Sequence, residues 1–552
     1  MIINQIKTSY WIFLLSLIFL AQDPLNSQSQ MFPKPYVSQV WVADIGDGTY
    51  KNPVLNADYS DPDAIRVNDD FYMIASSFDQ VPGLPILHSK DLVNWSLIGH
   101  ALKRQPPFEV FDKTQHGNGV WAPAIRHNNN EFYIYYPDPD FGIYLTKAKK
   151  ITGPWSAPQL VLAGAGLIDP CPLWDDDGRV YLAYAYAGSR AEIKSILVIR
   201  EFNREGTKPL SDPVLVFDGH EKDPTVEGPK LYKRNGYYYI FAPAGGVATG
   251  WQLVLRSKNI YGPYDRKVVM AQGNSPVNGP HQGAWVNTPK GQDWFLHFQD
   301  KEAIGRVVHL QPMKWVNDWP VIGADADGDG TGEPVLRYKK PDLGKNYPIQ
   351  TPIESDEFDN PFLGLQWQWQ ANPQETWSFM QPSQGVLKMV AKPIPENARN
   401  LWDVPNVLLQ KFPTDEFTVT TKIKFTRAVK PTGEKMGLTT MALSYGNIAV
   451  KTKKDGQYIV FTTCEDADKG SKEIEKEIVK LNQRDVYFRI QFSKDTTYKF
   501  SYSLDGSHFN TVGGMKAVPG KWIGIKMGLF ATSESPINDS GYMEVDWFRV
   551  TK

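Results

Sequence analysis

The segment Asp61-Pro-Asp-Ala-Ile65, with the run Asp69-Asp-Phe-Tyr-Met-Ile74 that follows it, decides the fold because the same pair recurs along the first 320 residues. The five-residue segment aligns without gaps with Trp121-Ala-Pro-Ala-Ile125, Asp169-Pro-Cys-Pro-Leu173, Glu227-Gly-Pro-Lys-Leu231 and His281-Gln-Gly-Ala-Trp285. The repeat has a period of about 50 to 60 residues, which is typical of the blades of a propeller. Five units therefore predict a closed, five-bladed β-propeller without exposed sheet edges.

Each five-residue segment is followed by a second strand-like run. These runs begin with Asn, Asp or Gly and continue with aromatic and β-branched residues, at 69–74, 130–135, 177–182, 235–240 and 291–296. Such a beginning is typical of the second strand of a hairpin. We therefore expect two paired strands at the start of every blade.

The second half of the chain has a different pattern. Apolar and polar residues alternate at 385–391, 417–425, 457–461, 486–492 and 498–503, which predicts half-buried antiparallel strands. Their number and spacing favour a β-sandwich of about 200 residues. We predict an all-β chain with the propeller at 45–325, a linker rich in Gly, Pro, Asp and Lys at 326–352, and the sandwich at 353–552.

Composition narrows the classes of partner. The chain has 59 Lys and Arg against 61 Asp and Glu, a net charge of −2, so it lacks the basic surface of a nucleic-acid-binding protein or of a protein that binds anionic membranes. A neutral partner fits better. Aromatic residues make up 13% of the chain, which suits stacking on sugar rings, although aromatic-rich β cores account for most of them.

The N-terminal residues have the pattern of a secretory signal. Lys7 precedes an apolar run, Trp11 to Ala21, and a polar stretch follows. The run is too short to span a bilayer comfortably, so residues 1–27 are predicted to be a signal peptide and the protein to be periplasmic or extracellular. Cys171 and Cys464 lie about 290 residues apart, in different predicted domains, and no disulfide is expected between them.

In a propeller the first strand of each blade lines the central axis. The first residues of the five segments should therefore form one ring, which consists of Asp61, Trp121, Asp169, Glu227 and His281. Carboxylates packed this closely repel one another and raise at least one pKa, which indicates an active site. Glycosidic cleavage uses a carboxylic acid that protonates the leaving oxygen and a carboxylate that activates water or attacks carbon, and the ring supplies both.

Four motifs resemble those of glycoside hydrolase family 43, in type, order and spacing, over about residues 50–325. They are Tyr59-Ser-Asp-Pro-Asp63, Ile168-Asp-Pro170, Val226-Glu-Gly-Pro-Lys230 and Gly305-Arg-Val-Val-His-Leu-Gln-Pro312. The resemblance implies that Asp61 is the general base, Glu227 the general acid, and Asp169 the residue that tunes and orients the acid. It also implies inversion in a single displacement, with no cofactor required for the chemistry.

The same resemblance implies further site residues. Arg306 is similar to the family arginine that meets the bound sugar, and Trp121 and Phe78 are expected to be stacking walls, with core packing as the alternative for Phe78. His281 resembles an axial histidine associated with a structural calcium ion reached mainly through water; a core histidine with satisfied hydrogen bonds is the alternative. The run that starts at Asp325 begins like a calcium loop, but Leu336 occupies the position of the bidentate Glu, so we expect a solvated turn.

The second domain resembles the concanavalin A-like domain of a subset of exo-acting family 43 enzymes, in which one loop aromatic narrows the active site. Phe530, in Met527-Gly-Leu-Phe-Ala-Thr532, is similar to that residue. The alternative is a carbohydrate-binding module with its own sugar site. The implied substrates are oligosaccharides of plant polysaccharides that end in β-D-xylose or α-L-arabinofuranose. A retaining propeller enzyme that cleaves fructosides and a non-catalytic sugar-binding propeller remain as alternatives.

Overall fold

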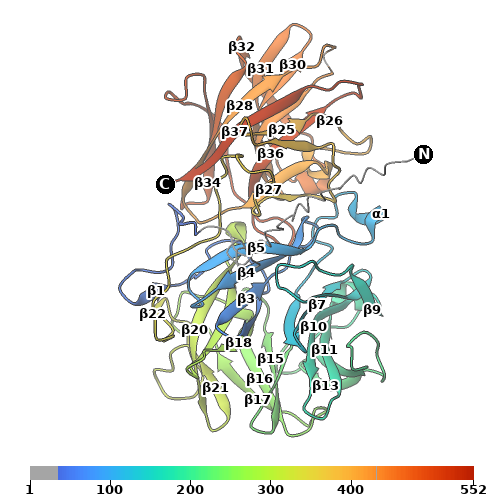
Figure 1. Ribbon diagram of the computed structural model, residues 1–552, viewed down its shortest axis with the longest axis vertical. Helices are drawn as coiled ribbons and strands as arrows, with labels where there is room; N and C mark the ends of the chain where they lie inside the picture. Colours follow the sequence, from blue (N-terminus) through green and yellow to red (C-terminus); the bar gives the residue numbers. More distant parts are fainter. Residues whose placement is uncertain (1–34, 431) are drawn as a thin grey trace, which may run out of the picture. The chain divides into compact units, whose positions relative to one another are not determined.

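The computed structural model describes residues 35–430 and 432–552, so the predicted signal peptide lies outside the described residues. The described chain is almost entirely β, with the first domain coloured blue to yellow and the second orange to red (Figure 1). Its short helical segments are α1 (Phe108–Phe111), α2 (Gly188–Ala191), η2 (Glu302–Ile304), η3 (Leu401–Asp403) and η4 (Ala467–Lys469). None of the helices in these two ranges is long and apolar enough to cross a membrane.

The first domain consists of five four-stranded antiparallel sheets within the described residues, and each sheet joins four consecutive strands in order. The strands of the successive blades are β2 (Asp63–Val67), β3 (Asp70–Ile74), β4 (Gly83–Ser89) and β5 (Trp95–Leu102); β6 (Ala124–Asn128), β7 (Glu131–Asp138), β8 (Gly142–Ala148) and β9 (Gln159–Ala163); β10 (Leu167–Trp174), β11 (Val180–Tyr186), β12 (Ile196–Phe202) and β13 (Val214–Asp218); β14 (Lys230–Arg234), β15 (Tyr237–Ala244), β16 (Trp251–Ser257) and β17 (Asp265–Met270); β18 (His281–Asn287), β19 (Asp293–Asp300), β20 (Arg306–Val316) and β21 (Trp319–Ile322). The predicted five-bladed propeller is confirmed.

The second strand of every blade coincides with one of the five predicted runs. In blade 4, the turn between β14 and β15 contains Asn235 and Gly236, both with positive φ, at 50° and 75°. Two left-handed residues in succession match the twist of a hairpin, and Asn and Gly are the residues that adopt this conformation at least cost. The turn residues therefore fix the register of this hairpin.

Aromatic rings fill the spaces between the blades. Ring pairs join blade 1 to blade 2 (Tyr72–Phe132, 5.7 Å between centroids), blade 2 to blade 3 (Tyr133–Trp174, 4.8 Å), blade 3 to blade 4 (Tyr181–Tyr261, 5.9 Å) and blade 4 to blade 5 (Phe241–Phe295, 6.0 Å). Edge-on, tilted and stacked pairs at these distances add about 0.5–1.5 kcal/mol each beyond the area that they bury. Much of the aromatic content of this domain therefore serves packing.

The ring of blades is closed by the segment that precedes it. Leu55 and Val308 of β20 exchange backbone hydrogen bonds of 3.2 and 3.0 Å. Strand β1 (Thr49–Lys51) pairs with β22 (Arg337–Lys339), which lies inside the predicted linker 326–352. That stretch therefore packs on the propeller, and it is not a free connection.

The second domain consists of two antiparallel sheets that face each other across a shared apolar core. In sheet order they contain β23 (Gln368–Trp369), β27 (Val407–Lys411), β36 (Lys526–Ser533), β29 (Lys435–Met441), β30 (Tyr445–Lys453), β31 (Gly456–Cys464) and β32 (Ile474–Leu481), with β26 (Lys392–Pro393) beside β36; and β24 (Ser378–Gln381), β25 (Val386–Val390), β37 (Tyr542–Thr551), β28 (Phe417–Thr426), β33 (Asp485–Phe492), β34 (Thr497–Ser503) and β35 (Asn510–Lys516). In β28 buried and part-buried residues alternate, as a period of two requires. The predicted sandwich is confirmed.

The sandwich bonds directly to the propeller. Val81, in blade 1, and Trp369, in β23, exchange backbone hydrogen bonds of 2.9 and 2.6 Å. The amide side chain of Asn372 accepts from the backbone N–H of Gln105 and donates to its carbonyl, at 2.7 and 2.9 Å. Cys171 in β10 and Cys464 in β31 are both buried and are not joined by a disulfide.

Candidate active site

A pocket of about 270 Å³ lies at the axis of the propeller and contains all five residues of the predicted ring. Its lining consists of Asp61, Phe78, Trp121, Ala122, Ile168, Asp169, Thr225, Glu227, Gly246, Val247, His281, Gln282, Arg306 and Trp522. All but Trp522 come from the propeller. The structure thus brings together seven of the eight predicted site residues; the exception is Phe530.

The ring residues stand where regular strand pairing begins, and only His281 is the first residue of a strand. Asp61 and Asp169 adopt left-handed backbone conformations, with φ of 54° and 57°, and Gly228, directly after Glu227, has φ of 60°. Aspartate tolerates this conformation better than most side chains, but each such position still costs free energy. The register of β10 against β11 shifts at this point, between Ile168 and Cys171. The break in pairing lets these side chains face the axis.

Asp61 is held by three side chains. Its Oδ2 accepts hydrogen bonds from the hydroxyls of Ser60 and Ser76, at 2.7 and 2.6 Å. Nη1 of Arg306 donates to Asp61 Oδ1 at 3.1 Å and to Ser60 Oγ at 2.9 Å. The carboxylate of Asp61 is 6% exposed, so it is a fixed acceptor at the bottom of the pocket.

Asp169 and Glu227 form a second acidic group. The N–H of Gly228 donates to Asp169 Oδ2 at 2.7 Å, which ties the two positions together. Burial, together with the nearby charges of Glu227 and Asp61, raises the pKa of Asp169 to about 8. Asp169 therefore keeps its proton at neutral pH, which removes one negative charge from beside Glu227.

Glu227 is the more accessible member of that pair. Its side chain is 26% exposed, against 1% for the neighbouring His281. Nε2 of His281 lies 3.0 Å from Glu227 Oε1 and orients the carboxyl group. The other ring nitrogen of His281, Nδ1, is buried and has no protein partner among the described residues.

Aromatic side chains form the walls. Trp121 donates from Nε1 to the carbonyl of Gly117 at 2.9 Å, and its ring meets that of Trp522 edge-on, with 6.2 Å between centroids. Phe78 is buried and exchanges backbone hydrogen bonds with Val120. A flat indole with its N–H already bonded leaves a face that suits the C–H face of a sugar.

The expectation for Phe530 is wrong. Phe530 lies inside β36, is 1% exposed, and packs in the core of the sandwich with Leu409 and Tyr445. Every residue of β36 is buried, since the strand is central in its sheet and covered on both faces. The aromatic residue that the sandwich contributes to the pocket is Trp522, which the sequence analysis missed.

Trp522 had a sequence signal that could have identified it. It stands in the loop Pro519-Gly-Lys-Trp-Ile-Gly524, where glycines flank a large apolar side chain in a segment without strand periodicity. Trp522 is 52% exposed, and its backbone φ is 66°. A tryptophan in this conformation costs about 1–3 kcal/mol and persists only where neighbouring contacts impose it.

The run that begins at Asp325 brings three carboxylates together. One oxygen from each of Asp325, Asp327 and Asp329 lies within 4.8 Å of the others. The oxygens of Asp325 accept backbone N–H bonds from Gly328 and Gly330. The segment is a turn whose acidic side chains are exposed or half-buried, as the sequence analysis expected for a solvated turn.

Two family models match the chain. One, described as glycosyl hydrolases family 43, matches residues 50–320, and the other, described as the β-xylosidase C-terminal concanavalin A-like domain, matches residues 355–551. A protein of Xylanibacter ruminicola described as a putative β-xylosidase is 38% identical over 89% of this chain and 87% of its own length. A β-xylosidase of Formosa agariphila is 32% identical over 99% of this chain and 98% of its own length.

A solved structure agrees with these matches. A variant of a family 43 protein from Bacillus licheniformis is 25% identical and superposes with a TM-score of 0.77, over 91% of this chain and 99% of its own. The protein is thus a glycosidase, with its acidic pocket at the axis of the propeller. It belongs to glycosyl hydrolase family 43.

Replacing Trp522 and Phe530 separately should distinguish the pocket wall from the core. Trp522→Ala should lower kcat/KM about 10- to 100-fold with little change in Tm, because a half-exposed wall is lost. Phe530→Ala should cost about 3–5 kcal/mol of stability, because it leaves a cavity. Kinetics and thermal unfolding of both variants check this. A larger loss of kcat/KM in folded Phe530→Ala than in Trp522→Ala would contradict the assignment.

Proposed function

We propose that the protein is an inverting, exo-acting β-xylosidase that releases terminal β-D-xylose from oligosaccharides of plant xylans. α-L-Arabinofuranose is the second sugar considered, because it presents a similar arrangement of hydroxyl groups. The observation that carries the proposal is the separation of two acidic groups in one pocket. Asp61, bonded to Arg306, belongs to blade 1, whereas Asp169, with its raised pKa, and Glu227 belong to blades 3 and 4.

The geometry supports different roles for these groups. Asp61 accepts bonds from a guanidinium and two hydroxyls, so its orientation is fixed for taking a proton from water. Glu227 is the more exposed of the two carboxyl groups on its side of the pocket, so we assign it the delivery of a proton to the leaving oxygen. Asp169 is neutral near pH 7, so it adds no negative charge beside Glu227.

The proposed reaction is a single displacement. Water attacks the anomeric carbon on the side of Asp61, and the new C–O bond forms as the bond to the leaving oxygen breaks. Asp61 takes the proton released by the water, and Glu227 protonates the departing oxygen. An inverting mechanism requires room for the sugar and the water between the two carboxyl groups, and blades 1 and 4, which carry them, are not neighbours in the ring.

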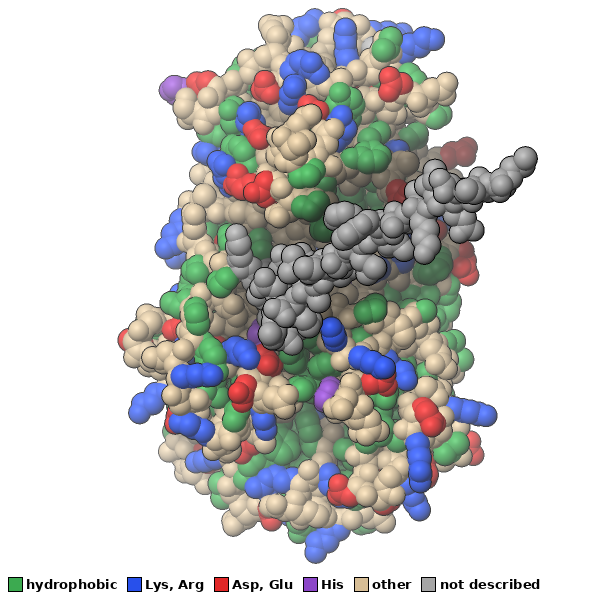
Figure 2. Space-filling view, in the orientation of Figure 1, with side chains coloured by type: hydrophobic (Ala, Val, Ile, Leu, Met, Phe, Trp, Pro, Cys, Tyr) green, Lys and Arg blue, Asp and Glu red, His purple; other side chains and the backbone are tan. Residues whose placement is uncertain are grey.

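The pocket supports exo attack and a neutral substrate. Trp522 of the sandwich and Trp121 of the propeller meet at the pocket, so a chain end enters more readily than the middle of a polymer. On the surface in view, Lys and Arg side chains are interspersed with Asp and Glu (Figure 2), which fits a sugar without charge. Arg306 has further N–H groups that suit sugar hydroxyls.

Removing either reacting carboxyl group should stop turnover. Asp61→Ala and Glu227→Ala are each expected to lower kcat on 4-nitrophenyl β-D-xyloside by at least about 10²- to 10⁴-fold, with circular dichroism unchanged. Proton NMR of the wild-type reaction should show α-xylose as the first product. Retained activity in either variant would remove that residue from the mechanism, and β-xylose as the first product would exclude inversion.

A comparison of the xyloside with the matching arabinoside tests which sugar the enzyme prefers. With 4-nitrophenyl α-L-arabinofuranoside at equal concentration, we expect a lower kcat/KM than with the xyloside. A higher value would reassign the protein as an arabinofuranosidase. No turnover of either compound or of xylo-oligosaccharides would sink the proposed function.

The pH profile should report the titration of Asp169. The pKa of Asp169 is raised to about 8, so this carboxyl group is neutral below that pH and charged above it. The proposed mechanism uses the neutral form, so the rate should fall as the pH rises through about 8. In Asp169→Asn the side chain stays neutral at every pH. We therefore expect the fall in kcat/KM near pH 8 to disappear, together with a lower maximum; an unchanged alkaline limb would argue against this role.

We extend the proposal to a structural calcium ion beside His281. The buried Nδ1 of this histidine lacks a protein partner, as does Oε1 of the neighbouring Gln282, among the described residues. These groups fit the water shell of a calcium ion at the axis, which would supply a structural positive charge and no reacting group.

Removing calcium should then lower stability. We expect dialysis against a calcium-selective chelator to lower the Tm by several degrees, and added Ca²⁺ to restore it, because the ion binds only the folded state. The variant His281→Ala should show a smaller response to the chelator. An unchanged Tm in the wild type would exclude a structural ion.

A further inference from the structure

Asp58 bonds to both domains at once. Its Oδ1 accepts the backbone N–H of Arg306, in the propeller, at 3.0 Å. Its Oδ2 accepts the backbone N–H of Gly524, in the sandwich, at 3.0 Å. The residue is 3% exposed. One buried carboxylate thus joins the residue that contacts Asp61 to the loop that carries Trp522.

The two backbones that Asp58 joins are in unusually close contact. A Cβ on Gly524 would lie 2.1 Å from the carbonyl oxygen of Ile304, and a Cβ on Gly305 would lie 2.7 Å from the carboxyl group of Asp58. The N–H of Ile525 also donates to the carbonyl of Ala303 at 2.8 Å. The loop and the start of β20 meet backbone to backbone, so only glycine fits at these two positions.

The charge of Asp58 is balanced within the interface. Lys411 in β27 and Lys526 in β36 face each other; Lys526 is buried, Lys411 is part-buried, and the negative charge of Asp58 acts on both. Burial and the proximity of Lys411 lower the pKa of Lys526 to about 7, although Asp58 opposes that shift.

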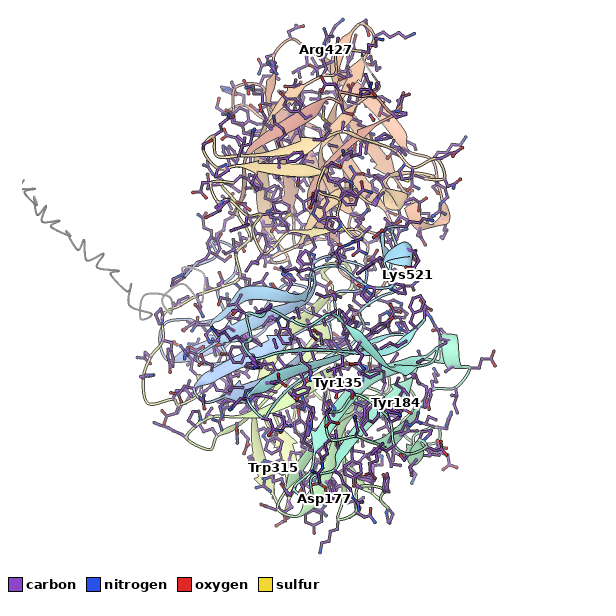
Figure 3. The ribbon with its side chains drawn as sticks, turned by 45° about the vertical axis from the view of Figure 1, so that its right-hand side comes forward. Tyr135, Asp177, Tyr184, Trp315, Arg427 and Lys521 are labelled. Carbon is purple, nitrogen blue, oxygen red and sulfur yellow. The ribbon has the colours of Figure 1, made fainter. Side chains whose placement is uncertain are left out.

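Trp522 needs such an anchor. Its left-handed backbone is strained, and it lies two residues before Gly524 at the tip of a short turn in which the N–H of Gly520 donates to the carbonyl of Ile523. Lys521, labelled in Figure 3, packs its side chain against Gly117 of the propeller. The contacts on either side of Trp522 hold the strained residue in place.

We propose that Asp58 is a positioning residue that holds the Trp522 loop and Arg306 in one arrangement around the sugar. It touches no substrate and acts through the two backbone N–H groups. The kinetic tests of this inference rest on the proposed function, whereas the hydrogen-exchange tests do not.

Hydrogen exchange tests the two bonds without reference to activity. In Asp58→Asn the amide nitrogen must face one of the two N–H donors, so one bond is lost with the shape preserved. Peptides that cover 519–526 and 303–308 should exchange at least about 10-fold faster than in the wild type, while a peptide of β16 should not change. Asp415→Asn is the matched control, because Asp415 also crosses the interface, to Lys301 at 3.2 Å, without contacting the loop.

Kinetics tests the consequence for the pocket. Asp58→Asn should raise KM for the aryl xyloside about 10-fold and lower kcat less, and Asp415→Asn should resemble the wild type. If Asp58 acts through the loop, then the double variant Asp58→Asn/Trp522→Ala should have nearly the kcat/KM of Trp522→Ala alone. Multiplied losses would overturn the proposal, as would unchanged exchange at 519–526.

A second variant covers the case in which Asp58→Asn does not fold. Gly524→Ala keeps the carboxylate but forces the loop away from Ile304, so it should give the same faster exchange and the same rise in KM. Wild-type kinetics in Gly524→Ala would contradict the proposal. A wild type that hydrolyses no pentoside would defeat the proposed function alone, because the exchange result would still decide the role of Asp58.

Discussion

Closure of five blades around one axis is the constraint on which the rest of the structure depends. It brings five chain positions, separated by more than two hundred residues between the first and the last, to the rim of one small space. Asp61 precedes its innermost strand, and Asp169 lies where the pairing of β10 with β11 is interrupted, so both residues can adopt left-handed conformations. A regular strand would alternate its side chains between the two faces of the sheet. The convergence of carboxylates is thus a product of topology and of local irregularity.

The same ring gives chemically similar side chains different environments. Asp61 is surrounded by donors, whereas Asp169 and Glu227 face each other with one backbone donor and one imidazole. Asp169 keeps its proton at neutral pH, whereas Asp61 is a fixed acceptor, and this division of the pocket suits acid and base catalysis. The division comes from neighbours on different blades, since Arg306 belongs to blade 5 and Ser76 to blade 1.

The sequence was sufficient where the signal was local or repeated. The repeat located Asp61, Asp169, Glu227 and His281, and the alternation of β28 and β33 predicted the sandwich. The sequence was insufficient for residues whose location depends on long-range packing. Phe530 and Trp522 are both aromatic residues near glycine, and only the burial of β36 between its neighbours shows that the first is core. The sequence contains no signal for Asp58, because its two partners lie about 250 and 470 residues further along the chain.

The pairing of β1 with β22 has a consequence for how such chains can be rearranged. The segment that completes the edge of the first domain is encoded after its last blade, in what appears from composition to be a spacer. Ser38 likewise bonds to Thr351 and Glu354, close to the start of the second domain. Cutting the gene at the apparent boundary would therefore separate strands that belong together. The two domains therefore depend on one shared segment. A chimera that takes either domain from another family member would have to include the intervening strand β22 as well.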